Sequence, residues 1–225
     1  MSANSKKRPG WVAILREIAI VVVIALVVTF VVRTWLVRAF YIPSASMSST
    51  LEVDDRVLAN QLAPTLGTID RGDIIVFNDP GGWLDGTTVA QYEPNPVLAA
   101  IGLVPADAGQ QLIKRVIGVG GDTVECCDEE GRVTVNGAPL QEDYLDAAVA
   151  PSEMPFHAEV PPGHYWVMGD NRANSLDSRY NEDTAGGAFV PEDNVVGTAF
   201  LLNWPLQRFG IISNPDEVFA HVPEP

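Results

Sequence analysis

Lysine is scarce in this chain. Lysine and arginine together number 14 in 225 residues, and after Lys7 only one lysine follows, Lys114. A solvated surface as long as residues 38–225 ordinarily carries many lysines. Lys114, the single lysine in residues 38–225, is therefore a candidate functional residue.

Cysteine and histidine are scarce too. The only two cysteines, Cys126 and Cys127, are adjacent, so no long loop can be closed by a disulfide within the chain. A vicinal disulfide and two free thiols both remain open. His157, His164 and His221 do not supply the spaced ligand pairs of a zinc site. We expect neither a metal nor a cofactor.

Only the start of the chain carries a net positive charge. The net charge is −15, but residues 1–40 hold six basic residues against one acidic residue, which leaves −20 for the rest. So acidic a body would repel phosphates, which argues against nucleic acid as a partner.

One apolar run has the character of a membrane span. Residues 18–32, IAIVVVIALVVTFVV, carry no charge, and Trp11 and Trp35 flank the run at a spacing suited to the two membrane interfaces. Lys6, Lys7 and Arg8 precede it, and the positive-inside bias keeps that end cytoplasmic. We expect a cytoplasmic tail at 1–10, an anchor at 11–37 and an extracytoplasmic domain at 38–225.

A cleaved signal peptide is the rival interpretation of the same run, with small residues at SAS, 44–46. Arg33 and Arg38 fall where a cleavage region should be neutral, and the gap from Val32 to Ala45 is too long. An uncleaved anchor is therefore favoured.

The body beyond the anchor shows mainly β signals. Short β-branched or aromatic runs occur at 55–60, 72–78, 111–119, 163–169 and 195–204. Residues 131–140 predict a hairpin, because Asn136-Gly137 suits a tight turn. No amphipathic helix pattern persists for more than two turns after residue 40. These signals predict a mainly β, antiparallel domain.

Two further segments stand apart from this pattern. Residues 79–110 are rich in Gly, Pro and Asp and predict a loop-rich insertion between strands. Residues 200–210, FLLNWPLQRFG, are apolar but too short to span a membrane, and we expect them to touch the lipid surface.

Three features could carry chemistry. The stretch FYIPSASMSSTL, 40–51, gathers four serines close behind the anchor, although serine clusters are also common in linkers. Lys114 shares a strand face with Leu112 and Val116, so burial would lower its pKa and free the amine as a base; a snorkelling edge lysine is the plainer alternative. The loop in VMGDNRANSLDSRY, 167–180, suggests internal hydrogen bonds and ion pairs that make it rigid.

Together these segments resemble a known family. IPSASM, RGDIIVF, LIKRVIGVGGDTV and MGDNRANSLDSR occur in the order seen in type I signal peptidases, which are membrane-anchored serine/lysine endopeptidases that remove signal peptides from exported proteins. The resemblance covers the anchor and most of the body, and it implies that signal peptides and membrane lipid are the partners.

The resemblance also implies roles for single residues. Ser46 resembles the nucleophile and Lys114 the general base. Ser44 is similar to the hydroxyl that helps to form the oxyanion hole, and Ser175 to the group that orients the lysine. Two further sets of residues match. Ile42, Met47, Leu51 and Ile113 match the substrate-pocket positions of the family, with ordinary core packing as the alternative. Asp170, Asp177 and Arg179 match residues that brace the site through ion pairs.

The chain departs from the usual family pattern at four places. Ala45 stands where Gly is frequent, Ser49 and Gly120 replace Pro, and Ala173 stands where many members have Asp. None of these removes a catalytic side chain.

Other functions are weighed against this one. A Ser/His hydrolase would use His157 or His164, although no partner carboxylate motif lies near either in the sequence. A non-catalytic anchored binding module and a protease dedicated to itself or to one partner are the further alternatives.

Overall fold

The structure is a computed structural model that describes residues 10–84 and 111–225. It divides into two units, residues 1–37 and residues 38–225. Residues 85–110 of the predicted insertion lie outside the described residues. The first residues of the predicted insertion, 79–84, form a tight loop. In it the Asp79 carboxylate accepts hydrogen bonds from the N–H groups of Gly81 and Trp83.

The first unit contains α1 (Trp11–Val31), which continues into a π turn (Val32–Leu36). The 21 residues of α1 span about 31 Å, close to the roughly 30 Å of a bilayer core. None of its side chains is buried. Among the described residues it is the one helix long and apolar enough to cross a membrane.

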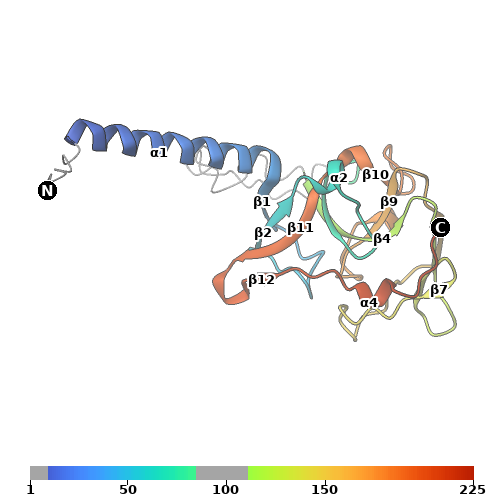
Figure 1. Cartoon of the computed structure of the whole chain (residues 1–225). Helices are drawn as coiled ribbons and strands as arrows, with labels where there is room; N and C mark the ends of the chain where they lie inside the picture. Colours follow the sequence, from blue (N-terminus) through green and yellow to red (C-terminus); the bar gives the residue numbers. More distant parts are fainter. Residues whose placement is uncertain (1–9, 85–110) are drawn as a thin grey trace, which may run out of the picture. The chain divides into compact units, whose positions relative to one another are not determined.

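The second unit is built around a large antiparallel sheet in the order β1-β2-β11-β3-β4-β9-β10, with β12 paired to β11 (Figure 1). Its strands are β1 (Val37–Tyr41), β2 (Arg56–Asn60), β3 (Ile74–Asn78), β4 (Gln111–Val119), β9 (His164–Met168), β10 (Val190–Pro191), β11 (Val195–Trp204) and β12 (Gly210–Ile211). The β-branched runs that predict strands all fall on this sheet.

A smaller sheet has the order β7-β6-β5-β8. Its strands are β5 (Thr123–Cys126), β6 (Val133–Val135), β7 (Ala138–Pro139) and β8 (Phe156–Glu159). The predicted hairpin joins β6 to β7, and Asn136 and Gly137 both have positive φ, 51° and 77°, as a tight hairpin turn requires.

The helices in the described part of the second unit are short. They are α2 (Ala63–Leu66), α4 (Asp216–Phe219) and the 3₁₀ turns η2 (Ser178–Tyr180), η3 (Glu192–Asn194) and η4 (Leu206–Arg208). The predicted fold class, a mainly antiparallel β domain behind one apolar N-terminal helix, is confirmed.

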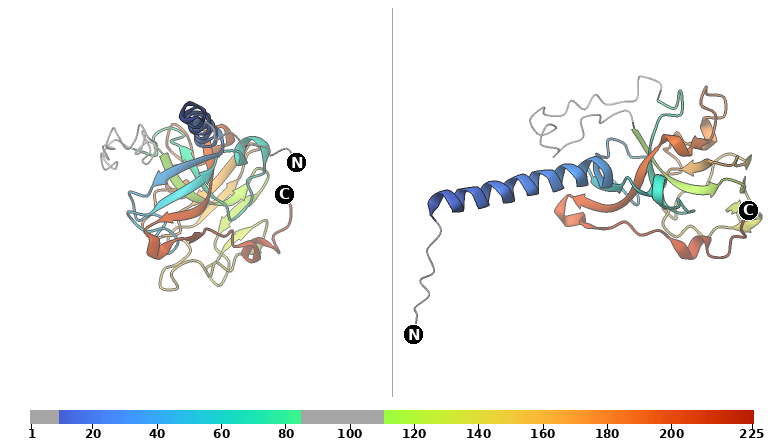
Figure 2. Two further views of the ribbon diagram at one scale, coloured as in Figure 1. Left: turned by 60° about the vertical axis from the view of Figure 1, so that its left-hand side comes forward. Right: turned by 45° about the horizontal axis from the view of Figure 1, so that its top comes forward.

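Two positions in this unit matter for the site. Strand β4 lies between β3 and β9 in the sheet, and seven of its nine residues are buried. The β11–β12 hairpin lies at the opposite end of the domain from β7 and the C-terminus (Figures 1 and 2).

Candidate active site

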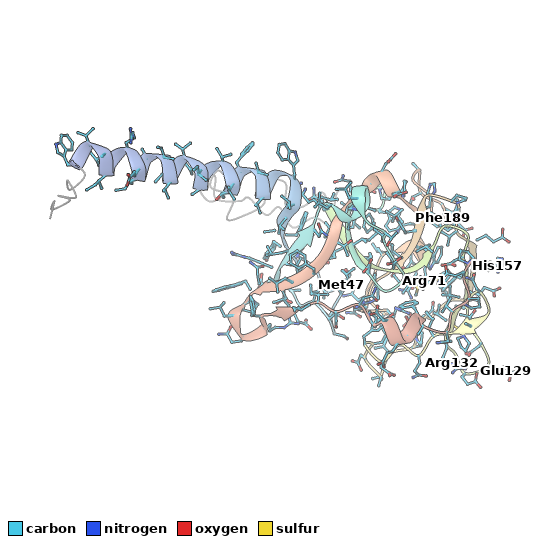
Figure 3. All side chains as sticks on the ribbon, viewed as in Figure 1. Met47, Arg71, Glu129, Arg132, His157 and Phe189 are labelled. Atoms are coloured by element: carbon cyan, nitrogen blue, oxygen red, sulfur yellow. A yellow bond between two sulfur atoms is a disulfide. The ribbon has the colours of Figure 1, made fainter. Side chains whose placement is uncertain are left out.

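Ser46 lies on a turn that follows β1. The N–H groups of Thr50 and Leu51 donate to the carbonyl of Met47 at 3.1 and 2.8 Å. The side chains of Met47 and Leu51 are buried in a cluster that also includes Ile113; Figure 3 labels Met47. Core packing therefore fixes the backbone that carries the Ser46 hydroxyl.

Asn171 ties this turn to the loop after β9. Its backbone N–H donates to the Ser46 carbonyl at 3.0 Å, and its side-chain Nδ2 donates to the Ala45 carbonyl at 2.9 Å. The loop after β9 thus holds the turn through two hydrogen bonds.

Lys114 reaches Ser46 from the middle of β4. Its Nζ lies 2.8 Å from Ser46 Oγ and donates a second hydrogen bond to the Ile113 carbonyl at 2.9 Å. The side chain is buried, with 4% of the residue exposed. This burial excludes the alternative of a snorkelling edge lysine.

The setting of Lys114 changes its proton affinity. Burial removes water from the ammonium and lowers the pKa from 10.5 to about 8, although Asp177 and Asp170 oppose the change through their negative charge. At pH 7 a group with a pKa of about 8 is free amine in roughly one molecule in ten. The amine is thus available as a base at neutral pH.

Ser44 stands at the edge of the pair. Its Oγ is 3.4 Å from Ser46 Oγ, and its side chain is exposed. The hydroxyl is free to turn toward a group bound beside Ser46.

Ser175 is buried behind the pair. Its Oγ has no hydrogen-bond partner among the described residues. A Cβ added to Gly169 would lie 2.3 Å from that oxygen and 2.4 Å from the Ser46 carbonyl, so glycine is needed at 169 for this close packing. The predicted contact of Ser175 with Lys114 is not formed as a hydrogen bond in this structure.

Two buried ion pairs brace the site. Arg115 contacts Asp170 through Nε at 2.9 Å and Nη2 at 2.7 Å. Arg179 contacts Asp177 in the same two-pronged way, with both distances 2.8 Å. The second oxygen of Asp177 also accepts the N–H of Gly169.

The Arg115 pair links both halves of the site. The Thr50 hydroxyl, on the Ser46 turn, donates to Asp170 at 2.5 Å, while Arg115 follows Lys114 on β4. Sequence reasoning placed Asp170 in an ion pair but missed Arg115 and Thr50, because 55 and 120 residues separate them from Asp170.

A third buried pair was missed entirely. Arg172 contacts Glu142 at 2.9 and 2.5 Å, and the Tyr144 hydroxyl donates to the same carboxylate. The Tyr144 ring also lies 4.2 Å from the guanidinium carbon of Arg115, and burial raises the pKa of Tyr144 well above 10. Arg172 therefore braces the loop against a segment outside it, which the loop sequence alone did not suggest.

The four predicted pocket residues all belong to one core cluster. Ile42, Met47 and Leu51 are 1% exposed or less, and Ile113 is 7% exposed. Core packing accounts for the burial of all four, and a substrate-pocket role for them stays a prediction.

The histidines contact other groups. His157 Nδ1 lies 2.7 Å from Glu125 Oε1, a carboxylate 32 residues away in the sequence. His164 and His221 contact backbone carbonyls. Among the described residues no cluster of His, Cys, Asp and Glu could hold a metal ion, and Cys126 and Cys127 form a disulfide.

Comparison with known proteins agrees with these features. The sequence profile of the family described as "Signal peptidase, peptidase S26" matches residues 15–204. Signal peptidase I of Mycobacterium tuberculosis (strain H37Rv) is 40% identical over 242 residues, covering 95% of this chain and 81% of that protein. The corresponding protein of Leptolyngbya laminosa is 36% identical, covering 85% and 81%.

More distant relatives carry the same name. Signal peptidase I of Pseudomonas aeruginosa is 33% identical, covering 84% of this chain and 73% of that protein. A crystal structure of a signal peptidase I from Enterococcus faecalis V583 is 28% identical with a TM-score of 0.37, covering 60% of this chain and 98% of that one. The family match and the identities confirm the resemblance seen in the four motifs: the chain belongs to the signal peptidase family of serine peptidases, peptidase S26.

Proposed function

We propose that this protein removes N-terminal signal peptides from exported preproteins at the outer face of the cytoplasmic membrane, with Ser46 as nucleophile and Lys114 as general base. One observation carries the proposal: the buried Nζ of Lys114 lies 2.8 Å from Ser46 Oγ. Family membership supports the substrate class.

The chemistry follows from the two side chains. A serine hydroxyl is a weak nucleophile and needs a neighbouring base to take its proton as it attacks an acyl carbon. Neutral Lys114 accepts that proton, and the ammonium then returns it to the departing amine of the mature protein. The signal peptide is left as an ester on Ser46. Water, activated by the amine again free, hydrolyses the ester.

The other hydroxyls have supporting roles in this proposal. Ser44, 3.4 Å from Ser46 Oγ, donates with the Ser46 backbone N–H to the oxyanion that forms on the attacked carbonyl. Ser175, buried and without a partner among the described residues, orients the lysine once substrate binds. The ion pairs of Asp170 with Arg115 and of Asp177 with Arg179 keep the surrounding loop fixed.

Substrate preference is assigned to the apolar residues under the Ser46 turn. Ile42, Met47, Leu51 and Ile113 pack in one buried apolar cluster next to the Ser46 turn. A shallow pocket above such a cluster would accept only small side chains next to the scissile bond.

The proposal includes a membrane topology. Residues 1–10 form a cytoplasmic tail, 11–37 a membrane anchor and 38–225 the extracytoplasmic domain. The apolar helix α1 supports the anchor, and the basic residues before it support a cytoplasmic N-terminus. The hairpin around η4, with Trp204, Leu206 and Phe209 at 48%, 68% and 60% exposure, is the segment expected to touch lipid.

The test is processing of a purified preprotein by the detergent-solubilised full chain and by Ser46→Ala. We expect the mature protein from the parent enzyme and none from the variant. A Ser46→Ala protein that processes as fast as its parent would exclude Ser46 as the nucleophile.

Two controls separate the alternatives. A His157→Gln, His164→Gln double variant should process normally, whereas a Ser/His hydrolase would lose activity. Cleavage of several unrelated precursor peptides would distinguish a general processing enzyme from one dedicated to a single partner.

A further inference from the structure

A cavity of about 320 Å³ lies beside the Ser46 turn, between that turn and the β11–β12 hairpin. Its lining combines two guanidinium groups with apolar side chains, and none of the described residues that line it carries a carboxylate. The main lining residues are Thr50, Arg115, Tyr144, Arg208, Ile211 and Ile212. Its volume is at the lower end of the range for small-ligand sites.

Arg208 supplies unused hydrogen-bond donors to this cavity. Its Nη1 contacts Asp55 at 2.6 Å and its Nη2 donates to the Thr50 carbonyl at 3.1 Å. A guanidinium has five N–H groups, so Nε–H and one N–H on each terminal nitrogen have no acceptor among the described residues. Asp55 balances the charge of Arg208, but these donors still suit an acceptor-rich ligand.

Arg115 is more fully engaged. It pairs with Asp170 and donates through Nη1 to the Gly72 carbonyl at 2.7 Å. Arg115 therefore adds a fixed guanidinium group to the cavity lining and leaves few N–H donors for a ligand.

The lining of the cavity combines two guanidinium groups, each paired with a carboxylate outside the lining, with apolar side chains, in a domain that is acidic overall. Arg56 on β2 is paired in register with Trp204 on β11, and its side chain has no ion-pair partner among the described residues. Ile211, which lines the cavity, is 83% exposed, and Leu206 and Phe209 on the same hairpin are 68% and 60% exposed. Cationic groups beside exposed aromatic and aliphatic side chains are typical of surfaces that meet an anionic membrane.

We propose that this cavity binds the phosphodiester headgroup of an anionic phospholipid, whose acyl chains lie along the apolar β11–β12 hairpin. Phosphate oxygens accept the fork of N–H groups that Arg208 offers. The apolar hairpin continuous with the cavity selects a lipid rather than free phosphate. The inference rests on the proposed membrane location.

A ligand bound in the cavity would also affect the Ser46–Lys114 site. Thr50 lies four residues after Ser46 and donates to Asp170, and Arg115 follows Lys114 on β4. A bound headgroup contacts both of these bracing residues, so the same lipid that surrounds the substrate stiffens the site that cleaves it.

The test uses the full chain in nonionic maltoside micelles, without substrate. Dihexanoylphosphatidylglycerol, dihexanoylphosphatidylcholine and inorganic phosphate are titrated separately, and the dissociation constants are measured by calorimetry. We expect saturable binding of phosphatidylglycerol at least tenfold tighter than that of phosphatidylcholine or phosphate. Equal affinity for the two lipids would overturn the proposal, and phosphate binding as tight as phosphatidylglycerol would mean a general anion site instead.

Variants locate the binding. Arg208→Gln should weaken phosphatidylglycerol binding about tenfold. The matched control is Arg132→Gln, because Arg132 is equally exposed, 34% against 33%, and is also paired with carboxylates. Arg132 lies near Glu129, far from Met47 (Figure 3), so its loss should change nothing. Equal effects of the two substitutions would refute the assignment.

A second variant avoids the Asp55 ion pair. Ile211→Ser alters an exposed side chain, so the fold should be unaffected; it should weaken phosphatidylglycerol binding about threefold and leave phosphate binding unchanged. An unchanged lipid affinity would count against the hairpin as the acyl-chain surface. Binding measured on Ser46→Ala separates the two proposals, because the lipid site should persist there whether or not Ser46 is the nucleophile.

Discussion

Replacing Lys114 by methionine should abolish processing yet make the folded protein more stable at neutral pH. Burial lowers the pKa of Lys114 from 10.5 to about 8. That difference corresponds to about 3.4 kcal/mol against folding with a protonated lysine. Methionine has a similar length and carries no charge, so it removes this cost.

Lost hydrogen bonds reduce the gain. Lys114 contacts Ser46 Oγ and the Ile113 carbonyl, and each such bond is worth about 1 kcal/mol. The net stabilisation expected at pH 7 is therefore about 1–2 kcal/mol. For a domain of this size that raises Tm by roughly 2–8 °C.

The stability difference between Lys114→Met and the parent should depend on pH. Below about pH 8 the lysine is protonated in both the folded and the unfolded chain, and the folded state bears the full cost. Between about 8 and 10.5 the unfolded chain binds more protons, so the stability of the parent rises with pH and its deficit against Lys114→Met shrinks.

The assay is thermal unfolding of the detergent-solubilised full chain between pH 6 and 10.5. Ser46→Ala is the matched control, since it should also be inactive but keeps the buried amine and so keeps the pH-dependent rise. A Lys114→Met protein that is less stable than the parent at pH 7, with the same pH profile, would refute the reasoning.

Three further predictions follow from the same geometry. The kcat/KM of the parent should rise about tenfold per pH unit up to a pH of about 8 and then level off, because only neutral Lys114 acts as base; a flat profile from pH 5.5 to 9 would contradict this. Ser44→Ala should lower kcat roughly 100-fold or more, the usual effect of losing an oxyanion donor, with an unchanged circular dichroism spectrum; loss of the fold instead would mean a structural role. Asp170→Asn should destabilise the protein by about 3–5 kcal/mol in denaturant unfolding, because it leaves Arg115 buried without its carboxylate, whereas Asp128→Asn, at the partly exposed pair with Arg132, should cost much less.

The sequence predicted those parts of the fold whose signal is local. Residues 111–119 and 195–204 match β4 and β11 because β-branched runs bounded by polar or glycine residues favour strands. The short strands β5 and β8 were missed, since TVEC and FHAE contain too few residues to show alternation. Their pairing depends on contacts between distant segments, which local patterns do not encode.

The candidate site also combines features with a local sequence signal and contacts between distant segments. The scarcity of lysine and the position of Lys114 on a predicted strand marked it as a candidate. Its contact with Ser46, however, joins residues 68 positions apart in the sequence and was expected only through the family resemblance. The partners of Asp170 and Arg172 come from other strands and loops, and the Glu125 partner of His157 lies across a strand pair. Tertiary pairing decides these contacts, and sequence spacing gives no sign of it.

The most direct measurement is the rate at which Lys114→Met cleaves a purified preprotein, compared with the parent under single-turnover conditions. The account predicts a loss of at least a thousandfold, since no other base lies within hydrogen-bond reach of Ser46 Oγ among the described residues. Cleavage at the parental rate would contradict it.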